Sequence, residues 1–232
     1  EKNNWFKDES PVYNETNTIV KIIDQILKIN IKIQIIVVDD CSTDGSKEKL
    51  IKNKRKINKI LFLKKNSGKG AAIRAAQKYI KGQIVIIQDA DLEYSPNDYK
   101  KLINPIVKKK SLAVYGSRVL GKNRYKTNDF TSLMRVFFNH ILTLISNFLN
   151  GQRLTDAHTC YKVFDSKLFK KINLQENGFA FCPEVTTKIS KLKIEITEIP
   201  ISYKGRTYKE GKKISYLDGV MAIFALIKYK FF

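Results

Sequence analysis

The chain has 232 residues, 43% of them hydrophobic, which excludes a disordered protein and is long enough for one α/β domain with a sizeable core. Its 43 Lys and Arg against 22 Asp and Glu give a formal charge of +21. That charge favours polyanionic partners such as nucleotide phosphates, nucleic acid or an anionic membrane face, although a lysine-rich composition bias would also produce it. The cysteines lack CxxC spacing, which argues against a disulfide framework or a zinc site. No signal peptide is visible, and no apolar run approaches the roughly 20 residues that span a bilayer.

The first half of the chain alternates between helical and strand patterns. Isoleucines at helical spacing predict a helix over 18–29, and "IKIQIIVVDD" (31–40) predicts a buried strand that ends in acids. A capped helix is expected from Ser42 or Thr43. Strands are then predicted over 59–65, 82–90 and 111–118, with helices over 68–80 and 95–109 between them. This alternation predicts a mostly parallel central sheet flanked by helices, which binds ligands beyond the carboxyl ends of its strands.

The second half is less regular. Residues 131–150 predict a long helix that is apolar except for one polar stripe, formed by Ser132, Arg135, Asn139, Thr143, Ser146 and Asn150. A polar seam with wide apolar flanks suits an acceptor that has a phosphate head and an isoprenoid tail; otherwise the helix packs in the core with its seam toward solvent. Residues 193–203 predict a late strand, and residues 216–232 predict a terminal apolar helix.

Acids gather where the strand over 82–90 ends. Asp89, Asp91 and Glu93 directly follow the apolar run "IVII". Close carboxylates resist burial unless a cation neutralises them, and oxygen ligands suit Mg²⁺ or Mn²⁺. We therefore expect a divalent ion that holds a diphosphate at this position, although an isolated D-x-D also arises in capped loops.

Glycines mark the entrance of the helix over 68–80. Gly68 and Gly70 flank Lys69, and Arg74 follows one turn later. Exposed N–H groups and the helix dipole favour a phosphate at such an entrance. Simple capping of the helix by glycine explains the same residues, so by itself this motif leaves both interpretations open.

Several motifs occur together in an order that resembles family 2 glycosyltransferases, and most of all the polyprenyl-phosphate (dolichyl-phosphate) mannose and glucose synthases. The resemblance covers residues 11 to 230 or so. The motifs are "PVYNE" (11–15), "VVDDCSTDGS" (37–46), "NSGKGAAIRAA" (66–76), "DADLE" (89–93), "YGSR" (115–118), "LTDAHTCYKVF" (154–164) and "GRTYKEGKKISYLDG" (205–219). It implies a GT-A nucleotide-diphospho-sugar transferase fold in one domain over 1–232, with a nucleotide-sugar half to residue 118 and an acceptor half from residue 119.

The resemblance also implies roles for individual residues. The expected nucleotide-sugar site comprises Pro11, Tyr13, Glu15, Asp40, Asp89, Arg206, Lys212 and Lys213, to which the glycine-rich helix entrance adds Lys69 and Arg74. The expected metal ligands are Asp89, Asp91 and Glu93. The acceptor phosphate is expected at Arg118, Arg135 and Asn139, and Asp156 near the donor sugar. Catalysis would then depend on Asp89, Asp91, Asp156, Arg118 and Arg135.

These roles predict an inverting, Mg²⁺- or Mn²⁺-dependent hexosyltransferase. It would move glucose or mannose from UDP-glucose or GDP-mannose, with a leaning toward glucose, to a polyprenyl phosphate at the cytoplasmic face of the membrane. The acceptor phosphate is already an anion, so alignment and neutralisation of the diphosphate would suffice. Peripheral attachment is expected through the basic surface and the apolar segment 217–232. A nucleic-acid partner is not expected, because no matching motif occurs.

Two alternatives remain at this stage. The acceptor could be a lipid or glycan hydroxyl, in which case Glu184 is a candidate base, although an acid in the first turn of a helix has a structural explanation too. A degenerate protein that only binds nucleotide sugar is the other. It is suggested by "EKNNWFKDES" (1–10), which lacks the Val/Ile-rich first strand of the family, so that the strand is either short and polar or partly lost.

Overall fold

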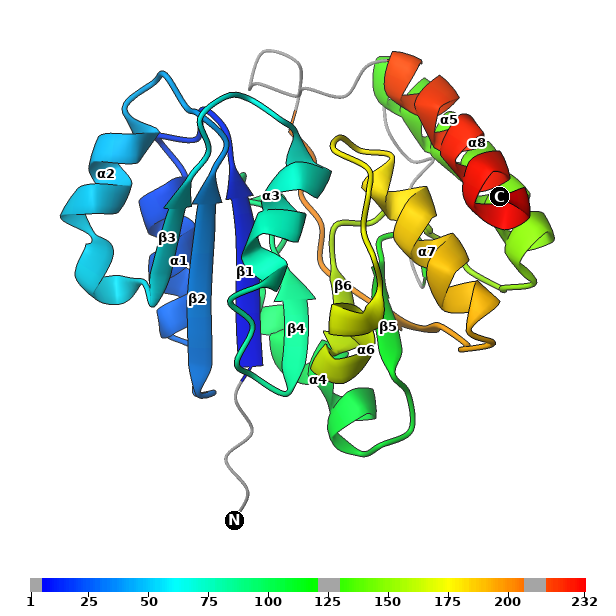
Figure 1. The fold of residues 1–232 in the computed structure, drawn as a ribbon, viewed down its shortest axis with the longest axis horizontal. Coiled ribbons are helices and arrows are strands. Elements are labelled where there is room, and N and C mark those ends of the chain that lie inside the picture. Colours follow the sequence, from blue (N-terminus) through cyan, green and yellow to red (C-terminus); the bar gives the residue numbers. More distant parts are fainter. Residues whose placement is uncertain (1–5, 121–129, 207–215) are drawn as a thin grey trace.

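The computed structural model describes residues 6–120, 130–206 and 216–232, and within these ranges the chain forms one seven-stranded sheet. The strand order is β3-β2-β1-β4-β6-β5-β7 (Figure 1). The strands are β1 (Phe6–Val12), β2 (Ile33–Asp39), β3 (Lys59–Phe62), β4 (Ile84–Ile87), β5 (Ala113–Ser117), β6 (Lys162–Asp165) and β7 (Thr197–Pro200). All neighbours are parallel except β6, which runs antiparallel to β4 and β5. The predicted mostly parallel α/β sheet is therefore confirmed.

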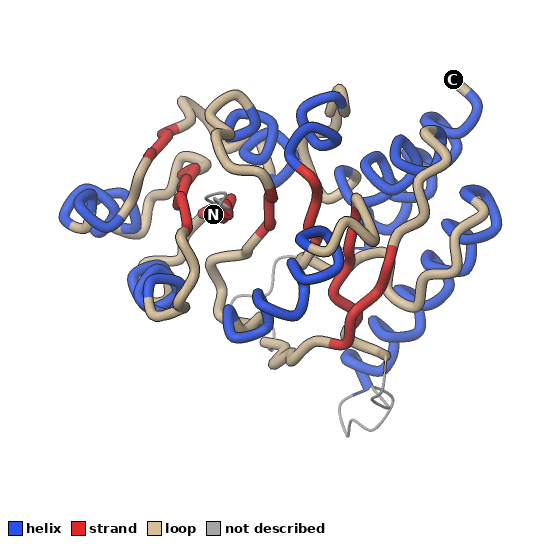
Figure 2. The backbone as a smooth tube through the Cα atoms, turned by 90° about the horizontal axis from the view of Figure 1, so that it is seen from below, coloured by secondary structure: helices blue, strands red, loops and turns tan. Residues whose placement is uncertain are grey.

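Helices lie on both faces of the sheet (Figure 2). They are α1 (Ile19–Leu27), α2 (Ser46–Lys52), α3 (Lys69–Gln77), α4 (Tyr99–Val107), α5 (Phe130–Asn150), α6 (Ser166–Lys171), α7 (Phe181–Lys191) and α8 (Tyr216–Phe231), with short 3₁₀ turns η1 (Lys54–Lys56) and η2 (Pro96–Asp98). The predicted helix after β2 begins at Ser46, later than Ser42 or Thr43, because Gly45 stands before it with a φ of 88°. The long helices α5 and α8 lie side by side at one end of the molecule (Figure 1).

The first strand is longer than its sequence suggested. β1 pairs in parallel with β2 from Phe6 to Val12 and with β4 from Phe6 to Glu9, so it lies in the middle of the sheet. Its polar composition does not prevent this, because the ladder is formed by backbone N–H and C=O groups. The alternative in which part of the strand is lost is wrong for the backbone. The strands β2 and β3 follow β1 on one side, and β4 lies on the other side of β1. The strand order therefore reverses between β1 and β4.

The loop at 175–178 packs tightly against the start of α3. The Asn177 carbonyl accepts the Ala71 N–H at 2.9 Å, and Arg74 donates to the Gln175 carbonyl at 2.6 Å and to Asn177 Oδ1 at 2.6 Å. A Cβ on Gly70 would lie 2.3 Å from the Glu176 carbonyl oxygen. Glycine is therefore required here, because two backbones approach closely. The same contact holds the segment that carries Lys69.

Replacing Gly70 tests this contact. Because the obstacle is backbone, Gly70→Ala should lower the free energy of unfolding by about 1–3 kcal/mol, the range for overpacking. Gly178 in the same loop has open space where a Cβ would stand, with no atom within 4 Å, so Gly178→Ala is the matched control. It should stay within about 0.5 kcal/mol of the wild type in urea denaturation. Equal losses in both variants would contradict the packing argument.

Candidate functional site

The site lies where β1, β2 and β4 end. Glu15 follows β1, Asp40 follows β2, and Asp89, Asp91 and Glu93 follow β4. These strands are parallel, so their carboxyl ends meet at one edge of the sheet, next to the reversal of strand order. The acids therefore gather at one edge of the sheet, as expected from the strand pattern.

Each acid after β4 has different partners. Asp89 forms an ion pair with Lys69, whose Nζ lies 2.6 Å from Oδ1 and 2.8 Å from Oδ2. Asp91 accepts the Glu93 N–H at 3.1 Å and contacts Arg206 Nη2 at 3.3 Å. Glu93 is buried and accepts the Tyr203 hydroxyl at 2.9 Å and the Arg206 N–H at 2.6 Å. Glu93 therefore anchors the segment after β7, and its role as a metal ligand stays a prediction.

Backbone strain helps to arrange these acids. Leu92, between Asp91 and Glu93, has a φ of 61°, in the left-handed region that branched side chains rarely adopt. Asn14 after β1 and Cys41 after β2 have φ values of 53° and 63°. Strained residues that cluster at the ends of neighbouring strands are typical of functional sites.

The electrostatics of the D-x-D differ between its two aspartates. Burial, and after it the charges of Asp89 and Glu93, raises the pKa of Asp91 to about 7, against the Glu93 N–H and Arg206, which lower it. Burial alone would lower the pKa of Lys69, but the Asp89 carboxylate outweighs it and holds that pKa well above its usual value. Asp91 thus lacks sufficient positive charge in its surroundings, whereas Asp89 is neutralised by Lys69.

These residues fit a divalent cation in part. The oxygen-only donors and the shortage of positive charge around Asp91 suit Mg²⁺ or Mn²⁺, which commonly bind one or two carboxylates plus substrate phosphates. Over the described ranges, no three His, Cys, Asp or Glu residues are grouped so that they could hold a metal ion. An ion would therefore take Asp91, with Asp89 beside it, and leave its remaining positions to a ligand.

Arg206 connects three acids across the site. Its Nη2 lies 2.9 Å from Glu15 Oε1 and its Nη1 lies 3.1 Å from Glu15 Oε2, while the same guanidinium contacts Asp91 and the backbone N–H donates to Glu93. Glu15 is buried and also accepts the Thr18 hydroxyl at 2.7 Å. Glu15 was predicted in the nucleoside pocket, and the structure gives it an ion pair with Arg206.

Other predicted donor-site residues are held by neighbouring loops. Asp40 is buried and accepts the N–H groups of Ser67 at 2.7 Å and Gly68 at 2.6 Å. The guanidinium of Arg74 is taken by the loop at 175–177, away from the D-x-D. The N–H of Ala71 at the start of α3 donates to Asn177, so the helix entrance interacts with protein rather than presenting all its amides to a phosphate. Gly68 stands at the N-cap of α3, which supports helix capping, the simpler explanation of this motif, and the close packing of the loop is an additional role of these glycines.

Pro11 and Tyr13 are partly buried at the end of β1. Lys212 and Lys213 lie outside the described residues, as does the side chain of Arg135, whose backbone belongs to α5. The roles expected for these residues stay predictions.

A second group of functional candidates lies beyond β5. Arg118 pairs with Asp156 through Nε at 2.6 Å and Nη2 at 2.8 Å, and both side chains are buried. Glu198 of β7 supports this pair by accepting the N–H groups of Thr155 at 2.7 Å and Asp156 at 3.0 Å. Arg118 and Asp156, predicted at the acceptor phosphate and the donor sugar, thus lie in direct contact.

A small cavity of 110 Å³ lies between α5 and the loop that carries Asp156. Its lining includes Asn139 and Thr143 of the polar stripe, together with Thr155 and Asp156. His140 also lines it. The stripe on α5 therefore faces Asp156 at this point.

Sequence reasoning missed several residues that organise the site. Tyr203 donates to Glu93, and its ring lies 5.3 Å from the Arg118 guanidinium. It therefore contacts both the acids after β4 and the Arg118–Asp156 pair. Gln88 is fully buried and accepts the hydroxyls of Tyr99 at 3.0 Å and Tyr161 at 2.6 Å beneath the D-x-D. Lys162, also fully buried, donates to the carbonyls of Ala157 and Thr159 in the loop that carries Asp156. Only the burial of a lysine inside a strand pattern could have drawn attention to it.

Comparison with known proteins identifies this arrangement. The model of glycosyl transferase family 2 matches residues 10–173. A dolichyl-phosphate beta-glucosyltransferase of Trichomonas vaginalis is 27% identical over 83% of this chain, and the chain spans 64% of that relative. A UDP-N-acetylglucosamine–dolichyl-phosphate N-acetylglucosaminyltransferase of Methanococcus voltae is 26% identical over 95% of this chain and 94% of its own length.

Solved structures agree on the fold. A glucosyl-3-phosphoglycerate synthase of Mycobacterium tuberculosis, crystallised with Mn²⁺, UDP and glucosyl-3-phosphoglycerate, matches with a TM-score of 0.69. It is 17% identical, and the match covers 97% of this chain and 79% of that one. At this identity the likeness shows the fold alone, and it confirms the predicted GT-A fold.

The raised pKa of Asp91 predicts an unusual pH dependence of stability. A carboxyl whose pKa is raised on folding favours the folded state when protonated, and that contribution is lost as the pH rises through about 7. In EDTA, Asp91→Asn should therefore raise Tm relative to the wild type near about pH 8.5, and the gain should shrink toward about pH 5.5.

Asp89→Asn is the neighbouring control and should lower Tm at both pH values, because it leaves the Lys69 ammonium without its partner. Thermal unfolding followed by circular dichroism measures both variants. A Tm for Asp91→Asn below the wild type at the higher pH would contradict the assigned electrostatics.

Proposed function

We propose, from the premise that the chain belongs to glycosyl transferase family 2, that it transfers a hexose unit from a nucleotide diphosphate sugar to a polyprenyl phosphate at a membrane surface. The observation that carries the proposal is the D-x-D after β4, placed beside Lys69, Arg206 and Glu15 where the strand order reverses. Both relatives compared above are named for transfer to dolichyl phosphate, which supports this acceptor class.

The donor is expected at the acids after β4. Bound Mg²⁺ or Mn²⁺ would be held by Asp91 with Asp89 and would offset the charge that develops on the departing nucleoside diphosphate. Lys69 and Arg206 supply further positive charge from the protein itself, next to the same carboxylates. The names of the relatives support a glucosyl or N-acetylglucosaminyl donor, and UDP over GDP, in agreement with the leaning toward glucose.

The acceptor phosphate is expected near the cavity between α5 and the loop that carries Asp156, the partner of Arg118. Asp156 holds the guanidinium of Arg118 through two hydrogen bonds, and Tyr203 packs against its face, so Arg118 is fixed in orientation. Asn139 lines the cavity, and Arg135 lies one turn before it on α5. An acceptor phosphate aligned there needs no strong base, and attack opposite the diphosphate inverts the anomeric centre.

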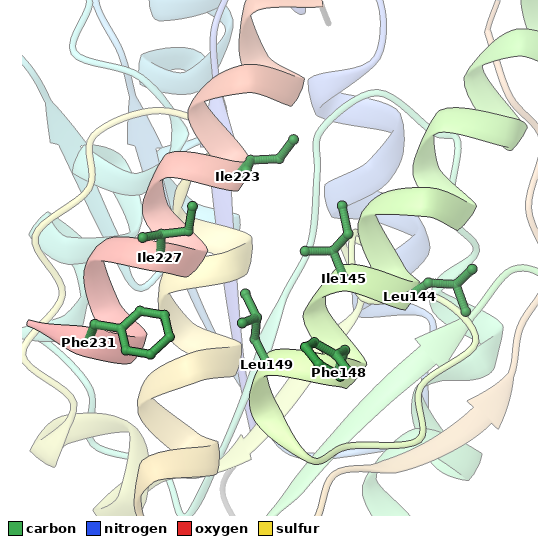
Figure 3. A pocket seen from close by; sticks show the side chains of 7 residues that line it. All are labelled: Leu144, Ile145, Phe148, Leu149, Ile223, Ile227 and Phe231. Atoms are coloured by element: carbon green, nitrogen blue, oxygen red, sulfur yellow. The ribbon is translucent and has the colours of Figure 1, made fainter.

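The acceptor tail is expected in an apolar groove between α5 and α8. The groove has a volume of 560 Å³ and is lined by Leu144, Ile145, Phe148, Leu149, Ile223, Ile227 and Phe231. Figure 3 shows Ile223 and Ile227 of α8 facing Ile145 and Leu149 of α5. A groove with this lining suits hydrocarbon and offers nothing to a second polar substrate.

The alternative with a hydroxyl acceptor loses its candidate base. Glu184 is fully buried, and its carboxylate accepts the N–H groups of Gln175 at 2.6 Å and Glu176 at 2.9 Å. Lys188 forms an ion pair with it at 2.6 Å. This carboxylate holds the loop at 175–176 in place, so the structural explanation of Glu184 is the better supported one.

Membrane attachment is proposed through the outer surface of α5 and α8. Within the described part of the chain, no helix has the length and apolar character needed to cross a bilayer. Large apolar side chains are nevertheless exposed on both helices, with Phe148 88%, Phe224 65% and Phe231 65% accessible. Lys230 in the last turn of α8 adds positive charge to the same helix, whereas Lys228 is paired with Glu176. Exposed apolar area beside basic residues is the usual combination for an interfacial helix.

The first test is transfer in the presence of Mn²⁺, with a panel of UDP- and GDP-sugars and a short polyprenyl phosphate. Arg135→Gln should lower kcat/KM for the phosphate acceptor about 10- to 100-fold, because hydrogen bonds to a charged group are lost. Binding of the metal and nucleotide should be unchanged. Arg153→Gln, an exposed arginine beyond the same helix, is the control for the loss of one charge.

Each outcome of this assay has a consequence. If Arg135→Gln leaves kcat/KM unchanged, a hydroxyl acceptor is favoured. Transfer from GDP-mannose alone would exclude glucose as the donor sugar. Binding of a donor without transfer would favour a protein that only binds nucleotide sugar. Failure of every donor to bind with metal would overturn the enzyme proposal.

The second test addresses the membrane. Phe148→Asp and Phe224→Asp should each weaken binding to anionic phospholipid vesicles at least about tenfold, since each removes an apolar side chain worth about 1.5–3 kcal/mol on burial. Leu27, 48% exposed at the end of α1, provides the control Leu27→Asp. Vesicle co-sedimentation measures all three. Equal binding by the Phe variants and the control would contradict attachment through α5 and α8.

A further inference from the structure

The guanidinium of Arg206 lies within the acidic cluster at the ends of β1 and β4. It forms two hydrogen bonds with Glu15 and a third contact, at 3.3 Å, with Asp91. The backbone N–H of the same residue donates to Glu93 at 2.6 Å. Arg206 thus reaches the carboxylates of both strand ends with positive charge, while Lys69 is paired with Asp89.

The contacts of Arg206 are unequal, and this suggests which of them is exchangeable. The pair with Glu15 has the two-pronged geometry that suits a guanidinium, whereas the contact with Asp91 is a single long one. The Nε atom is buried and has no hydrogen-bond partner among the described residues. A guanidinium held firmly on one side and loosely on the other has hydrogen-bonding capacity left for a ligand.

A purely structural ion pair is the simplest alternative. Such pairs are usually enclosed by packing, like Arg118 and Asp156, whose side chains are 8% and 3% exposed. The side chain of Arg206 is 20% exposed, and it stands at the edge of the sheet where ligands bind in this class of fold. Its position therefore belongs to the strand-end site more than to the core.

We propose that Arg206 is the resident counter-cation of the donor site: held by Glu15, it occupies the carboxylates until a divalent ion and a diphosphate replace it there. Arg206 then gives up Asp91 to the ion and turns its guanidinium to the diphosphate. Glu15 is a positioning residue that acts through Arg206. This inference rests on the proposed function, because it assumes that the acids after β4 receive a metal–nucleotide pair.

The proposal implies that metal and nucleotide bind cooperatively. An ion alone must compete with the guanidinium for Asp91, and a nucleotide alone meets uncompensated carboxylates. When both ligands bind, the nucleotide draws the guanidinium away from Asp91 and the ion neutralises the acids. Each ligand thus removes the obstacle to the binding of the other. By linkage, each ligand must raise the affinity of the other by the same factor, for which about 5- to 150-fold is typical.

The test is Mn²⁺ binding to the full chain, followed by electron paramagnetic resonance of the free ion, without nucleotide and then with UDP or GDP. Arg206→Gln should bind Mn²⁺ alone at least about fivefold more tightly than the wild type, because a competing cation is gone. The same variant should bind Mn²⁺ with nucleotide more weakly. A variant that is merely damaged would lose both. Arg55→Gln, an exposed arginine of η1, controls for net charge and should change neither.

A second variant tests the role of Glu15. Glu15→Gln should weaken binding of the Mn²⁺–nucleotide pair in the wild-type background and have no further effect in the Arg206→Gln background, since it acts through the arginine. Additive losses would mean that Glu15 contacts the nucleotide directly and would overturn its positioning role.

Unchanged or weaker binding of Mn²⁺ alone by Arg206→Gln, with nucleotide-dependent binding intact in the wild type, would overturn the counter-cation while leaving the proposed function standing. If the wild type binds no Mn²⁺ with either nucleotide, the proposed function fails, and this inference with it.

Discussion

Carboxylates concentrated at the ends of adjacent parallel strands must be neutralised, and much of this structure is arranged around that requirement. Glu15, Asp91 and Glu93 come from two neighbouring strand ends, with Asp89 beside them. Burying several carboxylates without positive charge is far less favourable than any packing contact they could gain. Lys69 reaches Asp89 from the start of α3, and Arg206 reaches Glu15 and Asp91 from beyond β7. The negative site therefore depends on two cations supplied by distant parts of the chain, in a protein whose net charge is strongly positive.

The second candidate group follows the opposite arrangement. Arg118 and Asp156 neutralise each other in the interior, and Glu198 and Lys162 hold the loop that carries Asp156. Such a pair changes little when a ligand arrives, because each charge already has its partner, and it is suited to orienting an anion rather than to exchanging with one. Tyr203 lies between the two groups, since its hydroxyl reaches Glu93 and its ring faces Arg118. The two groups thus share one side chain.

Much of the fold could be predicted from the sequence because it is encoded locally. Apolar runs that end in acids identified β2 and β4 and placed their ends at one edge, and the periodicity of residues 131–150 identified α5. The position of β1 was harder, since its polar side chains hide a strand whose pairing depends on backbone alone. Local sequence patterns do not predict contacts between residues that are far apart along the chain. Arg206 and Glu15 are 191 residues apart, and Arg74 is turned toward Gln175, 101 residues away. The glycines around Lys69 left a phosphate site and a simple helix cap both open, and neither interpretation anticipated the close approach of the loop at 175–178.

The loop at 175–178 also connects the apolar helix α8 with the acidic site. Glu176 accepts the Tyr229 hydroxyl at 2.7 Å and the Lys228 ammonium at 2.9 Å, so it holds the last turn of α8. Its neighbour Asn177 accepts from Ala71, and the Glu176 and Asn177 backbones lie directly against Gly70 and Gly68. Between these glycines stands Lys69, the partner of Asp89. A continuous series of short contacts therefore runs from the helix with the exposed apolar surface to the first aspartate of the D-x-D. The loop at 175–178 therefore contacts both α8 and the segment that carries Lys69, and it packs against that segment without room for a Cβ on Gly70.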